Sequence, residues 1–216
     1  MKNDSARMLS KRTQVVWAAF FLVIPTVLFV LLLGNNDMQV GVLLTTLAPV
    51  EERPDEDPVF SNIDNPSDWL TIVVQHLGQP AGSAELIDRN HRNIGLEGLG
   101  YHFLIGNGNG LGDGDVHIGY RWIKQIAAAK PGGVDEPQWN KGVISICLIG
   151  NGNRRPFTDQ QILHLSHLVQ RLQQQLSIPS SNVFLASDVG SDQTSPGKHF
   201  AEAQFRGQLL DIPGNN

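Results

Sequence analysis

The side chains best suited to chemistry are concentrated in one stretch, Gly98–Trp122, which reads GLGYHFLIGNGNGLGDGDVHIGYRW. Large aromatic residues with a polar group recur in it as Tyr101, Tyr120 and Trp122. Such a side chain offers an apolar ring and a hydrogen-bonding group together. Held on a rigid sheet, these aromatics would line a binding cleft.

Three other features contain residue types that can take part in catalysis or ligand binding, but their sequence context favours a structural role. Cys147 lies within the apolar run SICLIG, which predicts a small core residue rather than a nucleophile, and a single cysteine excludes an internal disulfide. The runs GNGNG and GDGD lack the lysine of a phosphate-binding loop and the spacing of a calcium loop, so they predict a turn. His164 and His167 fall on the polar side of a predicted helix and are expected at the surface.

The aromatic stretch itself predicts a β-hairpin. Its first strand, 100–106, is rich in aromatic and β-branched residues, its turn, 107–114, is rich in Gly, Asn and Asp, and its second strand is 115–122. Strand alternation predicts two opposite faces, with Tyr101, Phe103 and Ile105 on one and His102 and Leu104 on the other.

The remaining elements surround this hairpin. Apolar runs predict buried strands at Trp69–Leu77 and Val143–Gly150, and a short strand at Val183–Leu185. Ser83 is a candidate N-cap for the helix AELIDRNHR, and Thr158 with Gln161 forms a capping-box pattern that opens a helix to Leu176. The order of elements predicts an α/β fold, a mixed central sheet flanked by helices.

The N-terminus carries a separate signal. Val15–Leu33 is uncharged and apolar, about long enough for a bilayer core of ~30 Å, and four basic residues precede it. The positive-inside rule then predicts cytoplasmic residues 1–14, a transmembrane helix at 15–33, a linker at 34–66 and an extracytoplasmic domain at 67–212. The alternative is a cleaved signal peptide, but LLLGNNDMQ has no small-residue cleavage site.

The charge balance argues against nucleic acid as a partner. The 216 residues carry a formal net charge of −5, whereas nucleic-acid binding needs a basic face. No internal repeat organises the chain.

The hairpin resembles the core of the peptidoglycan recognition proteins and type 2 N-acetylmuramoyl-L-alanine amidases. GLGYHFLIG and VHIGYRW carry the resemblance, with NGNRRPFTDQQI and PGKHF further along, and it spans roughly Trp69 to Phe200. It implies a mixed sheet with helices on both sides. Active members of this family use a zinc-activated water to cleave the amide between the lactyl group of N-acetylmuramic acid and L-alanine.

The same resemblance implies a ligand set. His76 closes the first strand in IVVQH, where the family has its first zinc ligand, and Tyr101 matches the hairpin tyrosine that assists the transition state. Ala186 stands at the position of the second ligand, a histidine, and Ser195 at that of the third, a cysteine or aspartate. The zinc site is therefore expected to be degenerate, with His199, and Asp188 or Asp192, as possible substitutes.

Four further positions match residues around the family's binding groove: His91, Arg121, Trp122 and Asn140. An arginine fork beside an aromatic ring suits a stem-peptide carboxylate and a sugar face. Each also has a structural interpretation, as a packed histidine, a solvated arginine or a core tryptophan. The family's polar GAH is replaced by Ala127–Ala129.

Three functional hypotheses follow. The first is a membrane-anchored domain that binds peptidoglycan or muropeptides without a metal cofactor and without cutting them. The second is a zinc amidase with a shifted ligand set of His76, His199 and an aspartate. The third is a protein-interaction domain without affinity for glycans.

Overall fold

The computed structural model describes residues 58–61, 63, 66–129, 142–190 and 194–213. All of them belong to one compact unit, Asp57–Asn216. Within these ranges no helix is both long enough and apolar enough to span a bilayer. The predicted transmembrane helix, 15–33, lies outside them.

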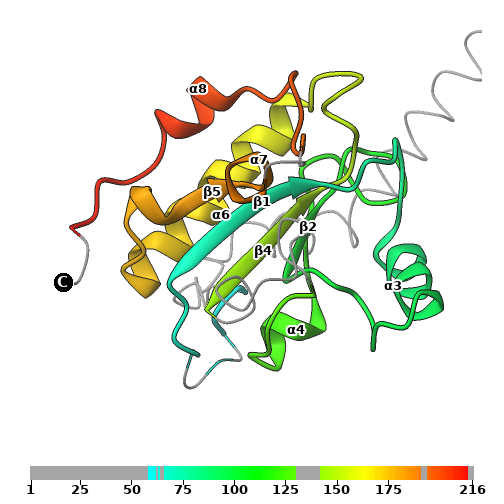
Figure 1. The fold of residues 1–216 in the computed structure, drawn as a ribbon, viewed down its shortest axis with the longest axis horizontal. Coiled ribbons are helices and arrows are strands. Elements are labelled where there is room, and N and C mark those ends of the chain that lie inside the picture. The colour runs from blue at the N-terminus through cyan, green and yellow to red at the C-terminus, as the bar shows by residue number, and fades with distance from the viewer. Residues whose placement is uncertain (1–57, 62, 64–65, 130–141, 191–193, 214–216) are drawn as a thin grey trace, which may run out of the picture. The chain divides into compact units, whose positions relative to one another are not determined.

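A five-stranded mixed sheet forms the centre of the unit, in the spatial order β3-β2-β4-β1-β5 (Figure 1). The strands are β1 (Thr71–His76), β2 (Phe103–Ile105), β3 (Val116–Ile118), β4 (Val143–Leu148) and β5 (Val183–Leu185). Strand β4 pairs in parallel with β2 and β1, β1 pairs in parallel with β5, and β2 pairs with β3 in antiparallel fashion. The carboxyl ends of the four parallel strands therefore meet at one edge of the sheet.

Helices cover both faces of the sheet, as the sequence predicts. Helix α6 (Asp159–Leu176) packs on one face against Phe103 and Ile146, and α3 (Ala84–Asn93) packs on the other against Leu104. Short helical segments complete the unit: α4 (Tyr120–Ile123), η2 (Ser180–Asn182), α7 (Ala186–Val189) and α8 (Glu202–Arg206). Because both faces are covered, β1 and β4 are nearly continuous apolar runs.

The two long helices begin at the predicted caps. The Ser83 hydroxyl accepts the Leu86 N–H at 3.2 Å at the start of α3. At the start of α6, Thr158 and Gln161 form both bonds of the capping box. These local signals are sufficient to define where each helix starts.

The hairpin forms, but its second strand is shorter than predicted. The chain leaves β3 at Ile118, and Tyr120 and Trp122 belong to α4 rather than to a strand. Gly119 donates to the His102 carbonyl at 2.7 Å, and its own carbonyl accepts the Trp122 N–H at 3.0 Å. A Cβ at Gly119 would lie 2.6 Å from the Tyr101 carbonyl oxygen, so this close turn requires glycine.

The predicted faces of the first hairpin strand also need correction. Tyr101 packs with Leu104, on the α3 side, rather than with Phe103. The His102 ring instead contacts Trp69 and Trp122. The reason is that regular alternation starts only at Phe103, where β2 begins.

The folded unit includes residues that the sequence assigned to the linker at 34–66. Val59 is buried in the main core, and its carbonyl oxygen accepts the Trp122 Nε1–H at 2.6 Å. The segment just after the charged run 51–57 is therefore part of the domain's packing.

Candidate functional site

His76 ends β1 at the edge where the parallel strands terminate, and its ring is held by two loops. Its Nδ1 lies 2.8 Å from the Pro196 carbonyl oxygen and 3.1 Å from the Gly152 nitrogen. A protonated Nδ1 donates to Pro196, and an unprotonated Nδ1 accepts the Gly152 N–H. Burial lowers the pKa of His76, and the bond with the Pro196 carbonyl partly opposes this shift. The imidazole is therefore biased toward its neutral form.

Ser195 lies directly beside His76. It is 7% exposed, and its hydroxyl oxygen accepts the His76 backbone N–H at 2.7 Å. The hydroxyl thus fastens the 194–197 loop to the end of β1. The Ser195 carbonyl in turn accepts the Ser187 N–H at 2.8 Å, which brings the start of α7 to the same place.

Ala186 is the first residue of α7 and is fully buried with Val73 and Val143. Its methyl group has no electron pair to offer a metal. The fold thus gathers the three predicted ligand positions, but they supply one imidazole, one neutral hydroxyl already in use, and one methyl group. This donor set does not fit a tight zinc site.

The predicted substitutes do not complete the set. The Asp188 carboxylate accepts the Leu185 N–H at 2.9 Å and pairs with Arg206 at 2.8 Å, so it is engaged elsewhere. His199 has an exposed side chain, and its backbone N–H donates to the Gly152 carbonyl at 2.9 Å. Asp192 lies outside the described residues. Within the described ranges, no three histidine, cysteine, aspartate or glutamate side chains are grouped to hold a metal.

His91 and Tyr101 form a second cluster, between α3 and the hairpin. The His91 Nδ1 accepts the Gly100 N–H at 2.9 Å, and the His91 and Tyr101 rings meet edge to face with centroids 5.2 Å apart. Burial lowers the pKa of His91. Because Nδ1 needs its lone pair for this bond, the ring is neutral and presents its proton on Nε2.

The Tyr101 hydroxyl lies beside the Cys147 thiol. The neighbouring sulfur and burial raise the pKa of Tyr101 far above its ordinary value, and burial likewise raises the pKa of Cys147. Both groups therefore stay protonated at neutral pH. Cys147 is a fully buried core residue, as the sequence predicts.

Arg121 and Trp122, two of the remaining predicted site residues, make structural contacts. Arg121 donates from Nε to the Leu99 carbonyl at 2.8 Å and from Nη1 to the Ala127 carbonyl at 2.6 Å. Trp122 is fully buried, which favours the core position among the two interpretations that the sequence left open. Asn140 lies outside the described residues.

Sequence reasoning missed a pair of matching loops at this edge. The hexapeptide LIGNGN occurs twice, at Leu104–Asn109 and Leu148–Asn153, which corrects the expectation of no internal repeat. Asn107 and Asn151 each accept a backbone N–H from the residue two positions on, at 3.1 and 3.0 Å. Their amides donate to the Pro80 and Gly78 carbonyls, both at 2.9 Å. The two loops therefore brace the segment that follows His76.

One family of known proteins matches this chain by sequence. A sequence profile described as N-acetylmuramoyl-L-alanine amidase matches residues 65–198. The fold is similar to N-acetylmuramoyl-L-alanine amidase LysC from Clostridium intestinale URNW, at 24% identity and a TM-score of 0.56, over 66% of this chain and 85% of that chain. Among curated proteins there is no match.

The fold is also similar to that of peptidoglycan recognition proteins. Bumblebee PGRP-SA shares 21% identity at a TM-score of 0.53, over 71% of this chain and 95% of that chain. Human PGRP-IBETAC was solved in complex with a glycosamyl muramyl pentapeptide. It shares 16% identity at a TM-score of 0.51, over 64% of this chain and 82% of that chain. At these sequence identities the similarity shows a shared fold and nothing more specific.

Proposed function

The chain belongs to the N-acetylmuramoyl-L-alanine amidase family, and we propose that it binds peptidoglycan or muropeptides without hydrolysing them. Family membership supports the ligand class, as does a similar fold that holds a muramyl pentapeptide. The observation that carries the absence of hydrolysis is the set of side chains around His76, where Ser195 and Ala186 replace donors that zinc needs.

The binding surface in this proposal is the flank of α3 that carries His91, together with Tyr101. The neutral His91 ring offers an Nε2–H donor beside an aromatic ring. Ile94, at the end of the same helix, is 75% exposed and extends the apolar part of this surface. A donor next to apolar rings suits a sugar or peptide that is polar at its edges and apolar at its faces.

The test is to mix the full-length protein with purified, insoluble peptidoglycan, with and without added zinc. We expect the protein to sediment with the peptidoglycan, and no stem peptide to be released under conditions in which an active amidase releases it. His91→Ala should weaken sedimentation, while His167→Ala, an exposed histidine on α6, should not.

One observation favours a second candidate, a zinc amidase with shifted ligands. Gly152 donates its N–H to His76 and accepts the His199 N–H, so the two histidines meet at one loop. Zinc-dependent release of stem peptides that is lost in both His76→Ala and His199→Ala would establish this candidate and overturn the proposal. Failure to sediment would leave the protein-interaction hypothesis.

We also propose that residues 15–33 anchor the chain in the membrane, with the domain on the extracytoplasmic side. The support is the uncharged apolar run itself, preceded by Lys2, Arg7, Lys11 and Arg12. Protease added to intact spheroplasts should then digest the domain, and full protection would refute this topology.

A further inference from the structure

Exposed apolar side chains are grouped at the end of the unit where β1 begins. Leu70 is 64% exposed, Ile123 55% and Ile126 36%, and they are three of the six large apolar side chains that the described residues expose. One such side chain alone needs no explanation, whereas a group of them on one surface marks a place of interaction.

Hydrogen bonds hold these side chains on one surface. The Ser67 N–H donates to Gln125 Oε1 at 2.8 Å, and the Ser67 hydroxyl donates to the Gln125 carbonyl at 3.1 Å. The segment that leads into β1 therefore runs beside the segment that follows α4. Leu70 from the first segment and Ala127 from the second line one hollow, of about 410 Å³.

The chain enters the unit at this surface. Pro58, the first residue that the structure describes, lines a small hollow with Ile123. In the membrane anchor proposed above, residues 34–57 connect the bilayer to Pro58, and a chain of that length reaches at most about 85 Å. The anchor is therefore attached to the unit beside its exposed apolar side chains.

The direction of β1 relates this surface to His76. The strand runs from Thr71, next to Leu70, to His76 at the opposite edge of the sheet, and α4 lies toward the end where β1 begins (Figure 1). A bilayer in contact with Leu70 would therefore leave the His76 edge facing away from the membrane.

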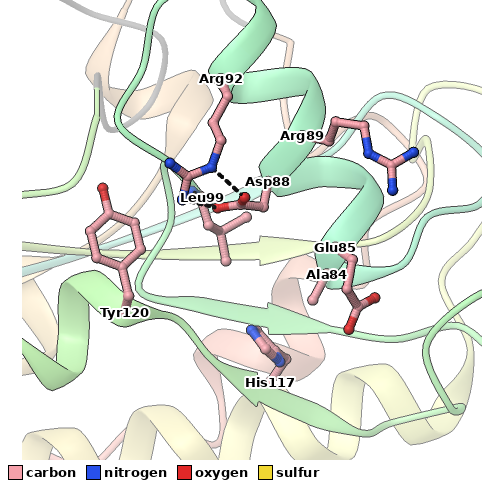
Figure 2. A pocket seen from close by; sticks show the side chains of 8 residues that line it. All are labelled: Ala84, Glu85, Asp88, Arg89, Arg92, Leu99, His117 and Tyr120. Carbon is pink, nitrogen blue, oxygen red and sulfur yellow. Dashed lines mark hydrogen bonds and ion pairs between the residues drawn. The ribbon is translucent and has the colours of Figure 1, made fainter.

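The flank of α3 is a contrasting surface. Its pocket, of about 500 Å³, is lined by the charged side chains of Glu85, Asp88, Arg89 and Arg92 (Figure 2). Asp88 and Arg92 are paired there, with Nε 2.7 Å from Oδ2. Because transfer of charged groups into an apolar medium is costly, this flank is suited to water rather than to lipid.

The charges beside the apolar side chains are balanced. Asp68 lines the hollow next to Leu70, and Lys124 lies between Ile123 and Ile126 in sequence; both charged side chains are exposed. Attraction to an anionic surface needs a cluster of basic residues, which the described part of this surface does not offer. The surface therefore suits a zwitterionic bilayer, bound mainly through its apolar side chains.

We propose that Leu70, Ile123 and Ile126 rest on the extracytoplasmic surface of the bilayer that holds the anchor. The inference rests on the proposed anchor at 15–33. The three side chains would enter the boundary between headgroups and acyl chains, as the apolar face of an interfacial segment does. This contact would orient the domain, with the His76 edge directed away from the membrane.

The test uses the full-length protein in phosphatidylcholine vesicles, with the fluorophore NBD attached to a single introduced cysteine and a doxyl quencher on the acyl chains. Ile123→Cys places the label on the proposed contact, and Leu163→Cys, at a 41% exposed position on α6, is the matched control. Cys147 is fully buried, so the wild type should take up little label. We expect quenching about threefold stronger at position 123 than at position 163.

A second substitution tests whether the apolar surface causes the contact. Leu70→Glu, combined with Ile123→Cys, should lower the quenching at position 123 to the level of the control, because a carboxylate is unfavourable at the boundary. Leu163→Glu in the same background should leave the quenching unchanged. Both leucine side chains are exposed, so neither substitution removes a core contact.

Flotation of the same vesicles separates this inference from the proposals on which it depends. Protein that floats with the vesicles but is quenched equally at positions 123 and 163 would overturn the inference and leave the anchor standing. Unchanged quenching in Leu70→Glu would also overturn it. Protein that does not float would overturn both the anchor and the inference, while sedimentation with peptidoglycan tests the binding proposal independently.

Discussion

The His76 backbone N–H donates to the Ser195 hydroxyl at 2.7 Å, joining the end of β1 to the loop that precedes α8. The Ser195 carbonyl accepts the Ser187 N–H at 2.8 Å, and Ala186 is the residue before it. The fold thus brings together the three positions at which the resemblance predicts zinc ligands, and the Ser195 hydroxyl links two of these segments.

Removal of the hydrogen bond between the His76 N–H and the Ser195 hydroxyl should destabilise the domain. Ser195→Ala leaves the His76 N–H without its partner in a largely buried position, so we expect the free energy of unfolding to fall by about 1–2 kcal/mol. Urea denaturation measures the change, and Ser187→Ala, at an exposed serine nearby, is the control. Equal stability of the two variants would show that the hydroxyl has no such role.

Metal-binding side chains introduced beside His76 should create a zinc site. In the double variant Ala186→His with Ser195→Cys, an imidazole and a thiolate join His76, and we expect the zinc content after dialysis to rise above that of the wild type. The larger side chain at buried Ala186 should cost about 1–3 kcal/mol by overpacking, so the protein is purified with zinc present. Ser187→His with Ser195→Cys is the control, and equal zinc content would contradict the prediction.

The parts of the fold that are decided locally were predictable. The caps at Ser83 and Thr158 and the apolar runs of β1 and β4 lie within a few residues of the elements they define. The turn at Gly119 was not, because Val116, Ile118 and Tyr120 alternate whether or not the strand continues. The turn is accompanied by contacts with distant residues: Gly119 donates to the His102 carbonyl, and Trp122 Nε1 donates to the Val59 carbonyl.

The candidate site was also predictable only in part. The place of His76 at a strand end follows from the run IVVQH, but its bond to Ser195 joins residues 119 positions apart. The position of the Tyr101 hydroxyl beside Cys147 likewise depends on the pairing of β2 with β4. No local pattern contains either relationship.

Acid should weaken the domain through His102. This ring is buried, accepts the Ser145 N–H at Nδ1 and donates from Nε2 to the Ile126 carbonyl, both at 2.9 Å. Burial lowers the pKa of His102 to about 4, below its value of about 6.5 in an unfolded chain. Stability is therefore fully present above pH 6.5 and is lost as the pH falls toward 4, by roughly 3 kcal/mol.

Urea unfolding at several pH values between 7.5 and 4.5 measures this loss. His102→Gln should be less stable at pH 7.5 but should show a shallower decline than the wild type, because the titrating group is gone. His164→Gln, on α6, should retain the wild-type slope. Parallel pH profiles for wild type and His102→Gln would refute the assignment.

The matching loops should be energetically coupled. Asn107→Ala and Asn151→Ala each remove an amide that holds the segment 78–80, so each should cost about 1 kcal/mol. Because both amides act on one segment, the double variant should depart from the sum of the two by at least about 0.5 kcal/mol. Asn109→Ala, an exposed residue of the first loop, is the control, and strict additivity would show that the loops act independently.

A single buried amide should contribute more than any of these contacts. The Gln161 Nε2 donates to the Ile105 carbonyl at 3.1 Å and to the Ile149 carbonyl at 2.9 Å, and its Oε1 accepts the Thr158 N–H at 3.2 Å. It therefore joins the cap of α6 to the ends of β2 and β4. Gln161→Leu leaves these three polar groups without that partner, and we expect a loss of about 2–4 kcal/mol in urea denaturation.

Two further variants locate the source of that loss. Gln161→Glu keeps an acceptor for the Thr158 N–H but turns a carboxylate toward two carbonyl oxygens, so it should be at least as destabilising as Gln161→Leu. Gln160→Leu, at the exposed neighbouring position, should change stability by less than about 0.5 kcal/mol. Near wild-type stability in Gln161→Glu would mean that the capping bond alone matters and that the bonds to β2 and β4 contribute little.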